Sequence, residues 1–311
     1  MIVYGPVPSR RLGQSIGINN IPPKTCSYSC IYCQLGRTDH MQTERCSFYD
    51  PQLIFREAEI KMQQLKAENK RADYFSFVPD GEPTLDINLG RAIELIKPLG
   101  IPSAVITNAS LLWMDSVKED LMKADLVSVS IDSADEEIWR KADRPHGLLK
   151  HEDILKGILD FSKVFKGTLV TETMLMENVN DDEECIKKIA EQLAAINPDK
   201  VCLLVPVRPP AESNVKRPPS DRLERAAGII RALSGADIQY ITDDEKEDGF
   251  FFTDDISEDI LNISAVHPIR EDIIDRLLKK KNADRSLLSD LLDQGKLGAF
   301  FYEGKKFYKK L

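Results

Sequence analysis

Residues 25–34 read Thr-Cys-Ser-Tyr-Ser-Cys-Ile-Tyr-Cys-Gln and carry three cysteines at the spacing C-x3-C-x2-C. A structural zinc site is closed by four ligands, usually as paired C-x2-C units, and no convincing fourth ligand lies nearby in the sequence. A cluster of four irons also needs four ligands for closure, so three cysteines in one loop leave one iron open. Because chemistry occurs at open metal positions, the spacing favours a catalytic iron–sulfur centre over a structural metal site.

The sequence around this loop alternates short β-branched runs with amphipathic stretches. Asp50 can cap a helix that opens with Pro51 and carries apolar residues at helical spacing from Ile54 to Leu65. Such alternation predicts an α/β fold with a parallel sheet and helices outside. Six or seven units in ~240 residues are fewer than the eight of a closed barrel, so we expect a partial barrel. The expected strands are Ser15–Asn20, Tyr74–Pro79, Ser103–Thr107, Leu126–Ile131, Thr168–Leu175, Lys200–Val205 and Asp237–Ile241.

The composition is that of a globular protein, with 311 residues, 42% hydrophobic and 30% charged residues, and a net charge of −9. It excludes collagen-like, mucin-like and disordered classes. No apolar run reaches the ~18 residues of a membrane span, and residues 1–13 lack the hydrophobic segment of a signal peptide. Six cysteines are too few for a secreted disulfide scaffold. We therefore expect a cytoplasmic protein whose clustered thiols bind a metal or act in catalysis.

Charge is distributed unevenly toward the C-terminus. Residues 243–259 hold nine acidic residues and one lysine, and we expect this run to be an acidic linker. Residues 265–311 hold eleven basic and seven acidic residues, a net charge of +4. This segment could touch a nucleic acid, although a solvated helix face explains the same charge. The expected domains are therefore a barrel over residues 1–242, the linker over 243–259 and a C-terminal domain over 260–311.

The C-terminal domain is expected to be a small winged-helix-like module, because its pattern reads as two amphipathic helices followed by a β-hairpin. Helix–hairpin modules can read nucleic acid, so this one could present a substrate, or it could simply cover the barrel opening. Its aromatic residues could stack on bases, but at alternating hairpin positions they are expected to form the apolar core. The expected elements are helices over Ile269–Lys279 and Ser286–Gln294 and strands over Gly298–Tyr302 and Phe307–Lys310, with a turn at Glu303-Gly304.

A second motif, Gly81-Glu82-Pro83, follows the expected strand Tyr74–Pro79. Glycine permits a backbone approach that a side chain would block, and proline stiffens the turn. A carboxylate at a strand end can accept a hydrogen bond from a ligand ammonium group. Because this turn comes one strand–helix unit after the cysteine loop, we expect both motifs to face one site.

Four arginines are candidates for substrate contacts. Guanidinium groups bind phosphate or carboxylate bidentately, so a substrate with such a group would suit a barrel mouth lined by them. For the first two, anchoring of the N-terminal segment on the barrel is an equally good explanation. The candidates are Arg10, Arg11, Arg37 and Arg208.

The cysteine loop directly after a first strand, with Tyr32 before the last cysteine, resembles the radical S-adenosylmethionine superfamily over roughly residues 5–240. The resemblance implies a partial (β/α)6 barrel and a [4Fe–4S] cluster bound by Cys26, Cys30 and Cys33. In this family the open iron chelates the amino and carboxylate groups of S-adenosylmethionine. One electron then cleaves the sulfonium to give methionine and a 5′-deoxyadenosyl radical, which abstracts a hydrogen from substrate.

The resemblance also implies which residues contact S-adenosylmethionine. The family's aromatic residue at the Tyr32 position lies against the adenine, and its Gly-Glu-Pro turn holds the methionine amino group. Polar residues at strand ends are candidates for ribose or carboxylate contacts, although each of them could equally cap the next helix. The expected contacts are Tyr32, Gly81, Glu82, Pro83, Asn108, Ser130 and Asp132.

Residues 4–13, 18–24 and 33–38 look like a group of archaeal and bacterial iron–sulfur oxidoreductases related to the wyosine synthases. Those synthases rebuild a guanosine in phenylalanine transfer RNA using pyruvate, and carry extra cysteines before the radical loop that bind a second cluster. This chain has no cysteine before Cys26. Its other cysteines are scattered, which is weak support for a second cluster and argues against wyosine formation itself. These are Cys46, Cys185 and Cys202.

The sequence thus predicts a radical S-adenosylmethionine enzyme but does not identify its substrate, for which an RNA, as in transfer RNA modification, and a protein are the candidates. Such an enzyme needs an electron donor such as flavodoxin or ferredoxin, and no membrane is expected among its partners. The alternative is an RNA- or protein-binding regulator that uses an iron–sulfur cluster only as a structural or redox element. The open-iron spacing together with the Gly-Glu-Pro turn favours the enzyme.

Overall fold

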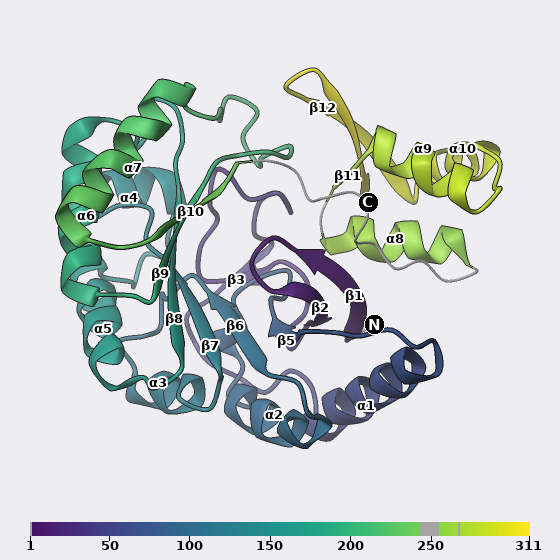
Figure 1. Ribbon diagram of the computed structural model, residues 1–311, viewed down its shortest axis with the longest axis horizontal. Helices are drawn as coiled ribbons and strands as arrows, with labels where there is room; N and C mark the ends of the chain where they lie inside the picture. The colour runs from purple at the N-terminus through teal and green to yellow at the C-terminus, as the bar shows by residue number, and fades with distance from the viewer. Residues whose placement is uncertain (1, 243–254, 267) are drawn as a thin grey trace.

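The computed structural model describes residues 2–242, 255–266 and 268–311 (Figure 1). Its main body is a curled eight-stranded sheet in the order β1-β2-β5-β6-β7-β8-β9-β10. Strand β1 (Val3–Ser9) is antiparallel to β2 (Gly13–Ile18), and the other neighbouring pairs are parallel. The predicted α/β partial barrel is thereby confirmed. The remaining strands are β5 (Tyr74–Phe77), β6 (Ser103–Thr107), β7 (Leu126–Ser130), β8 (Thr168–Met174), β9 (Lys200–Leu204) and β10 (Ile238–Ile241).

Two strands extend the six-unit barrel that the sequence resemblance implies. Strand β10 adds a seventh parallel strand beside β9. Strand β1 was not predicted, because Pro6 and Pro8 argue against a strand. It forms an edge of the sheet, where the missing amide donors of proline are tolerated.

Helices cover the outer face of the curled sheet, as Figure 1 shows. The predicted cap is present: the Asp50 side chain accepts a hydrogen bond from the Gln52 amide at 2.9 Å, and the helix begins at Pro51. The covering helices are α1 (Pro51–Ala67), α2 (Leu89–Ile96), α3 (Asp115–Leu121), α4 (Glu136–Asp143), α5 (His151–Val164), α6 (Glu183–Ile196) and α7 (Ser220–Ser234), with short 3-10 turns η1 (Pro83–Leu85) and η2 (Lys97–Leu99). None of the described helices is both long and apolar enough to cross a membrane.

The two faces of the strands pack differently. Val105 and Val127 belong to the large core that the strands form with the helices. Their neighbours Ala104 and Leu126 belong to a separate, smaller cluster. Since successive strand residues point to opposite faces, this smaller cluster lies on the inner side of the barrel. The inner side is therefore only partly filled by apolar side chains, and its polar remainder forms the site described below.

The C-terminal module contains a three-stranded antiparallel sheet in the order β11-β13-β12, packed with helices around its own apolar core. Its elements follow the order helix, strand, helix, helix, strand, strand, so it is winged-helix-like as predicted. Strand β11 and the first helix were not predicted. The elements are α8 (Ile256–Val266), β11 (Ile269–Arg270), α9 (Glu271–Lys280), α10 (Ser286–Asp293), β12 (Leu297–Tyr302) and β13 (Lys305–Lys310).

Two boundaries differ from the expectation. Helix α8 begins at Ile256, so the last residues of the expected linker 243–259 are helical; residues 243–254 lie outside the described residues. Ile269 pairs with Tyr308 in the sheet instead of starting a helix. Pairing buries Ile269 in the module core, which outweighs the amphipathic continuation that its sequence suggests.

Candidate functional site

The cysteine loop lies between β2 and α1, and its first residues are bound to the Gly-Glu-Pro turn. The Lys24 amide donates to the Asp80 carbonyl at 2.5 Å, and the Glu82 amide donates to the Thr25 carbonyl at 3.1 Å. A short parallel pair, β3 (Thr25–Cys26) with β4 (His40–Met41), continues the loop. A Cβ on Gly81 would lie 1.9 Å from the Thr25 carbonyl oxygen, so only glycine allows this approach. The two motifs therefore form one structural unit.

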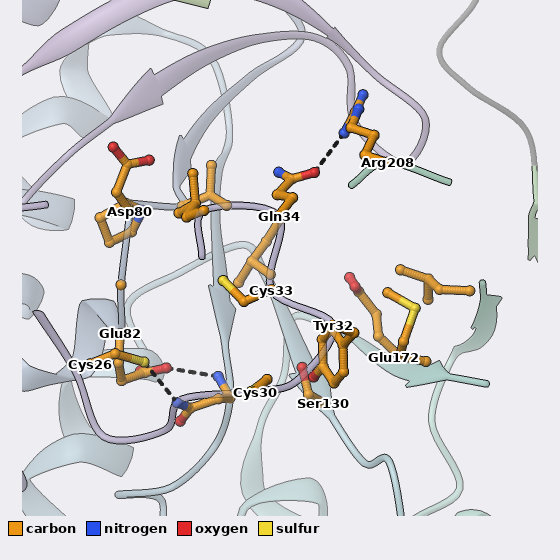
Figure 2. Close-up of a pocket in the computed structure, with 18 of the residues that line it drawn as sticks. Cys26, Cys30, Tyr32, Cys33, Gln34, Asp80, Glu82, Ser130, Glu172 and Arg208 are labelled. Carbon is orange, nitrogen blue, oxygen red and sulfur yellow. Dashed lines mark hydrogen bonds between the residues drawn. The ribbon is translucent and has the colours of Figure 1, made fainter. Parts of the chain in front are cut away.

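This unit borders a cavity of about 380 Å³ at the carboxyl ends of the strands, a volume typical of small-molecule and cofactor sites (Figure 2). Most of the predicted site residues line it, and Pro83 and Asp132 do not. The predicted residues on its wall are Cys26, Cys30, Tyr32, Cys33, Gly81, Glu82, Asn108, Ser130, Arg10, Arg11, Arg37 and Arg208. The topology thus brings together side chains from both motifs, four strand ends and the N-terminal hairpin.

The three cavity cysteines are free thiols in an environment that opposes the bare thiolate. Burial, followed by the charge of Glu82, raises the pKa of Cys26 to about 12. Burial is also the main cause of the raised pKa of Cys30 and of Cys33. A metal that binds these sulfurs would replace their protons and compensate the charge. The donor set therefore fits a thiophilic centre.

The arrangement fits a cluster better than a single ion. In the described ranges, which omit residues 1, 243–254 and 267, no three His, Cys, Asp or Glu side chains are gathered closely enough to hold one metal ion. In a [4Fe–4S] cluster each thiolate serves its own iron, so the ligating sulfurs need not converge on one point. Three cysteines on one loop beside a cavity match a cluster with one open position. The residues present fit the implied group.

Glu82 is almost completely buried and is held by donors from two strand ends. Its Oε1 accepts hydrogen bonds from Thr84 Oγ1 and Thr107 Oγ1, both at 2.6 Å, and its Oε2 accepts from the Asn108 amide at 2.7 Å. Burial raises the pKa of Glu82, while these bonds oppose the rise. The carboxylate thus ties the turn after β5 to the end of β6 and is fixed at the cavity wall.

Asn108 connects this wall to the first cysteine. Its Nδ2 donates to Ser27 Oγ at 3.0 Å and lies 3.6 Å from Cys26 Sγ. Ser130, at the end of β7, lines the cavity farther along the strand ends. Asn108 and Ser130 therefore both line the cavity, as they must if they are to contact the cofactor there.

Asp132 was predicted to contact the cofactor, but in the structure it lies outside the cavity lining. Tyr32 Oη donates to Asp132 Oδ2 at 2.5 Å and lies 3.3 Å from Asp143 Oδ1, while Asp132 Oδ1 accepts from the Met174 amide at 2.7 Å. Burial and the neighbouring Asp132 raise the pKa of Asp143. Asp132 therefore supports Tyr32 from behind the cavity wall. Asp143, the last residue of α4, was not predicted as a site residue.

Each of the four predicted arginines lines the cavity, and several of them also bind neighbouring protein groups. Arg11 forms an ion pair with Glu172 on β8, and Arg208 Nη1 donates to Gln34 Oε1 at 2.9 Å. Arg37 Nε donates to Glu212 Oε1 at 3.1 Å. The Arg10 carbonyl accepts from Gln239 Nε2 at 3.2 Å. The N-terminal anchoring that we considered for Arg10 and Arg11 and their placement at the cavity therefore occur together.

Sequence reasoning missed three further groups at one side of the cavity. Gln34 follows the last cysteine of the motif, and Asp80 precedes the Gly-Glu-Pro turn; both line the cavity. Burial raises the pKa of Asp80 to about 6, against the opposing charges of Lys309 and Lys310. Lys309 Nζ, from β13 of the C-terminal module, donates to the Gln34 carbonyl at 3.1 Å. Gln34 and Asp80 could have been suspected from their adjacency to the motifs, but nothing in the sequence links Lys309 to this site.

Comparison with known proteins gives a consistent assignment. Residues 20–192 match the family model of the Radical SAM superfamily. A UPF0026 protein of Methanocaldococcus jannaschii is 44% identical over 309 residues, which cover 99% of this chain and 96% of that protein.

Two solved structures are similar in fold. The structure of TYW1 with a lysine-pyruvate adduct bound has a TM-score of 0.53 at 19% identity and covers 71% of this chain and 74% of its own. A radical SAM methyltransferase from Sphaerobacter thermophilus has a TM-score of 0.55 at 14% identity, with coverages of 73% and 66%. At such identities the likeness concerns the fold alone.

Proposed function

The chain belongs to the radical S-adenosylmethionine superfamily, and on this premise we propose that it cleaves S-adenosylmethionine reductively to generate a 5′-deoxyadenosyl radical that abstracts hydrogen from a substrate. The observation that carries the proposal is the convergence of Cys26, Cys30 and Cys33 with the Gly81-Glu82 turn on one cavity. We assign the three cysteines as ligands of a [4Fe–4S] cluster. When bound, this cluster supplies the electron that cleaves the sulfonium.

The chain's own side chains bind and orient the cofactor. Glu82, fixed by its hydrogen bonds to Thr84, Thr107 and Asn108, can accept from the methionine ammonium group. Tyr32 has its hydroxyl held by Asp132, so its ring is presented to the cavity in one orientation. A site whose supporting hydrogen bonds are formed in advance loses little energy to rearrangement on binding.

For the substrate we propose an RNA. The proposal rests on the observation that some aromatic side chains of the C-terminal module are buried, whereas another is exposed to solvent. Phe307 and Tyr308 are buried, whereas Phe301 is 74% exposed on β12. Residues 265–311 of the module carry the net charge of +4 noted above, and its hairpin contacts the cavity loop through Lys309. An exposed aromatic on a basic hairpin suits base stacking and phosphate attraction.

The remaining partners follow from the same chemistry. A low-potential protein such as flavodoxin or ferredoxin would supply the electron. We propose the cytoplasm as the site of action, because thiolate ligands persist in a reducing compartment. Formation of wyosine itself is not part of the proposal, since the additional cysteines of that pathway's second cluster have no counterpart before Cys26.

The proposed reaction is tested with the full chain. We expect anaerobic reconstitution with iron and sulfide to give a brown protein that releases 5′-deoxyadenosine when dithionite and S-adenosylmethionine are added, measured by liquid chromatography and mass spectrometry. An iron-loaded protein that releases none would contradict the enzyme and favour the iron–sulfur regulator.

The proposed substrate class is tested by Phe301→Ala in the full chain. Stacking on one base contributes ~1–3 kcal/mol, so we expect affinity for a transfer RNA mixture to fall about 5- to 150-fold, measured by filter binding across a salt series. Phe301→Tyr retains a stacking face and should bind like the wild type. Equal affinity of Phe301→Ala and the wild type would contradict RNA stacking and favour a protein substrate.

A further inference from the structure

The hairpin β12–β13 of the C-terminal module lies against two loops at the carboxyl ends of the barrel strands. At its turn, Tyr302 Oη lies 3.4 Å from the carbonyl oxygens of both Pro206 and Val215, in the loop that follows β9. Tyr302 is buried despite its place at the tip of a hairpin. Near the other end of β13, Lys309 Nζ donates to the Gln34 carbonyl. The hairpin thus connects the loop after β9 with the cysteine loop.

Gln34 is the residue directly after Cys33, and it is held at two points. Its side-chain Oε1 accepts from Arg208, and its carbonyl oxygen accepts from Lys309 at 3.1 Å. Figure 2 shows Gln34 between Asp80 on one side and Arg208 on the other, with Cys33 beside it. The position of the segment that carries Cys33 therefore depends on a side chain from the C-terminal module.

Lys309 also brings positive charge to this end of the site. A Cβ built on Gly36 would lie 3.8 Å from Lys309 Nζ and 4.0 Å from Lys24 Nζ, so two ammonium groups converge on the same loop. Lys309 is half-buried, where charges are screened less than in water.

We propose that Lys309 is a positioning residue of the cluster site, which fixes the segment after Cys33 through the Gln34 carbonyl and places a positive charge beside that cysteine. The C-terminal module then completes the site in addition to contacting substrate. The inference rests on the proposed function in one respect, that the three cysteines hold a cluster. One-electron reduction adds negative charge, so a nearby ammonium group stabilises the reduced form and raises the reduction potential.

The test compares the reduction potentials of reconstituted full-length variants, in titrations followed by electron paramagnetic resonance without S-adenosylmethionine. Lys309→Met keeps an unbranched side chain of nearly the same length and removes its charge, so we expect a midpoint potential more negative than that of the wild type. Lys309→Arg restores charge and donor and should return the potential toward the wild-type value. Should Lys309→Met lose the fold, Lys309→Gln is a second neutral variant with the same expected shift.

Lys306→Met is the matched control. Lys306 lies on the same strand, but its ammonium group bonds to Glu271 at 3.2 Å and lies 5.0 Å from the centre of the Tyr308 ring, on the opposite face. We expect its potential to stay at the wild-type value. The proposal is overturned if the neutral Lys309 variants keep the wild-type potential, or if Lys306→Met shifts it equally. A protein that holds a cluster but cleaves no S-adenosylmethionine would contradict the proposed reaction and leave this comparison valid.

Discussion

Cys30→Ala should abolish both cluster retention and 5′-deoxyadenosine formation. Cys30 lines the cavity between the other two cysteines of the motif, so its loss leaves two sulfurs for a centre that is already one ligand short of closure. We expect both the iron content and the product to fall below the limit of detection, because an incompletely ligated cluster is lost during purification. Iron and sulfide content, visible absorbance and product release would be measured on the same anaerobic preparation.

Cys46→Ala is the matched control for this variant. Cys46 is also a half-buried free thiol between β2 and α1, but it lies outside the cavity, where its backbone bridges to Asp86. We expect it to keep its iron and its activity. Wild-type iron content in Cys30→Ala, or equal loss in Cys46→Ala, would show that the cavity cysteines are not the ligands.

The parts of the fold that the sequence predicted are those governed by local patterns. Asp50 caps α1 because a carboxylate before Pro51 satisfies a free amide at the helix start, whatever the distant surroundings are. Strand β1 was missed because two prolines oppose a strand locally, and only its place at the sheet edge makes them harmless. Edge position is a property of the whole sheet, which no local pattern contains.

The same division applies to the candidate site. The spacing of the three cysteines and the Gly-Glu-Pro turn are local signals, and the three cysteines, Gly81 and Glu82 all line the cavity. Asp132 was predicted to contact the cofactor from a strand end. Its carboxylate instead accepts a hydrogen bond from Tyr32, which is 100 residues away in sequence. Lys309 and Gln34 are 275 residues apart. Contacts of this kind arise from tertiary packing, so one sequence without a structure could not supply them.

Gly81→Ala should cause the second large loss, through crowding alone. The added Cβ would lie 1.9 Å from the carbonyl oxygen and 2.8 Å from the carbonyl carbon of Thr25, and both are backbone atoms that no side-chain rotation can move. Thr25 precedes Cys26, and its carbonyl accepts a hydrogen bond from the Glu82 amide, so relief of the clash must separate the turn from the cysteine loop. We expect reconstituted iron content and S-adenosylmethionine binding to fall to near background. Overpacking of this kind also costs roughly 1–3 kcal/mol of unfolding free energy.

Gly147→Ala separates this crowding from a general intolerance of glycine replacement. Gly147 also lies in a loop near the cysteine segment, close to His146, whose amide donates to the Ser27 carbonyl at 2.9 Å, but a Cβ there would meet nothing within 4 Å. We expect its iron content, cofactor affinity and urea unfolding midpoint to equal those of the wild type. The comparison is decisive because both substitutions add one methyl group and differ only in what that group meets. If Gly81→Ala binds iron and S-adenosylmethionine as well as Gly147→Ala does, the close contact at Thr25 does not hold the two motifs together, and the site cannot depend on it.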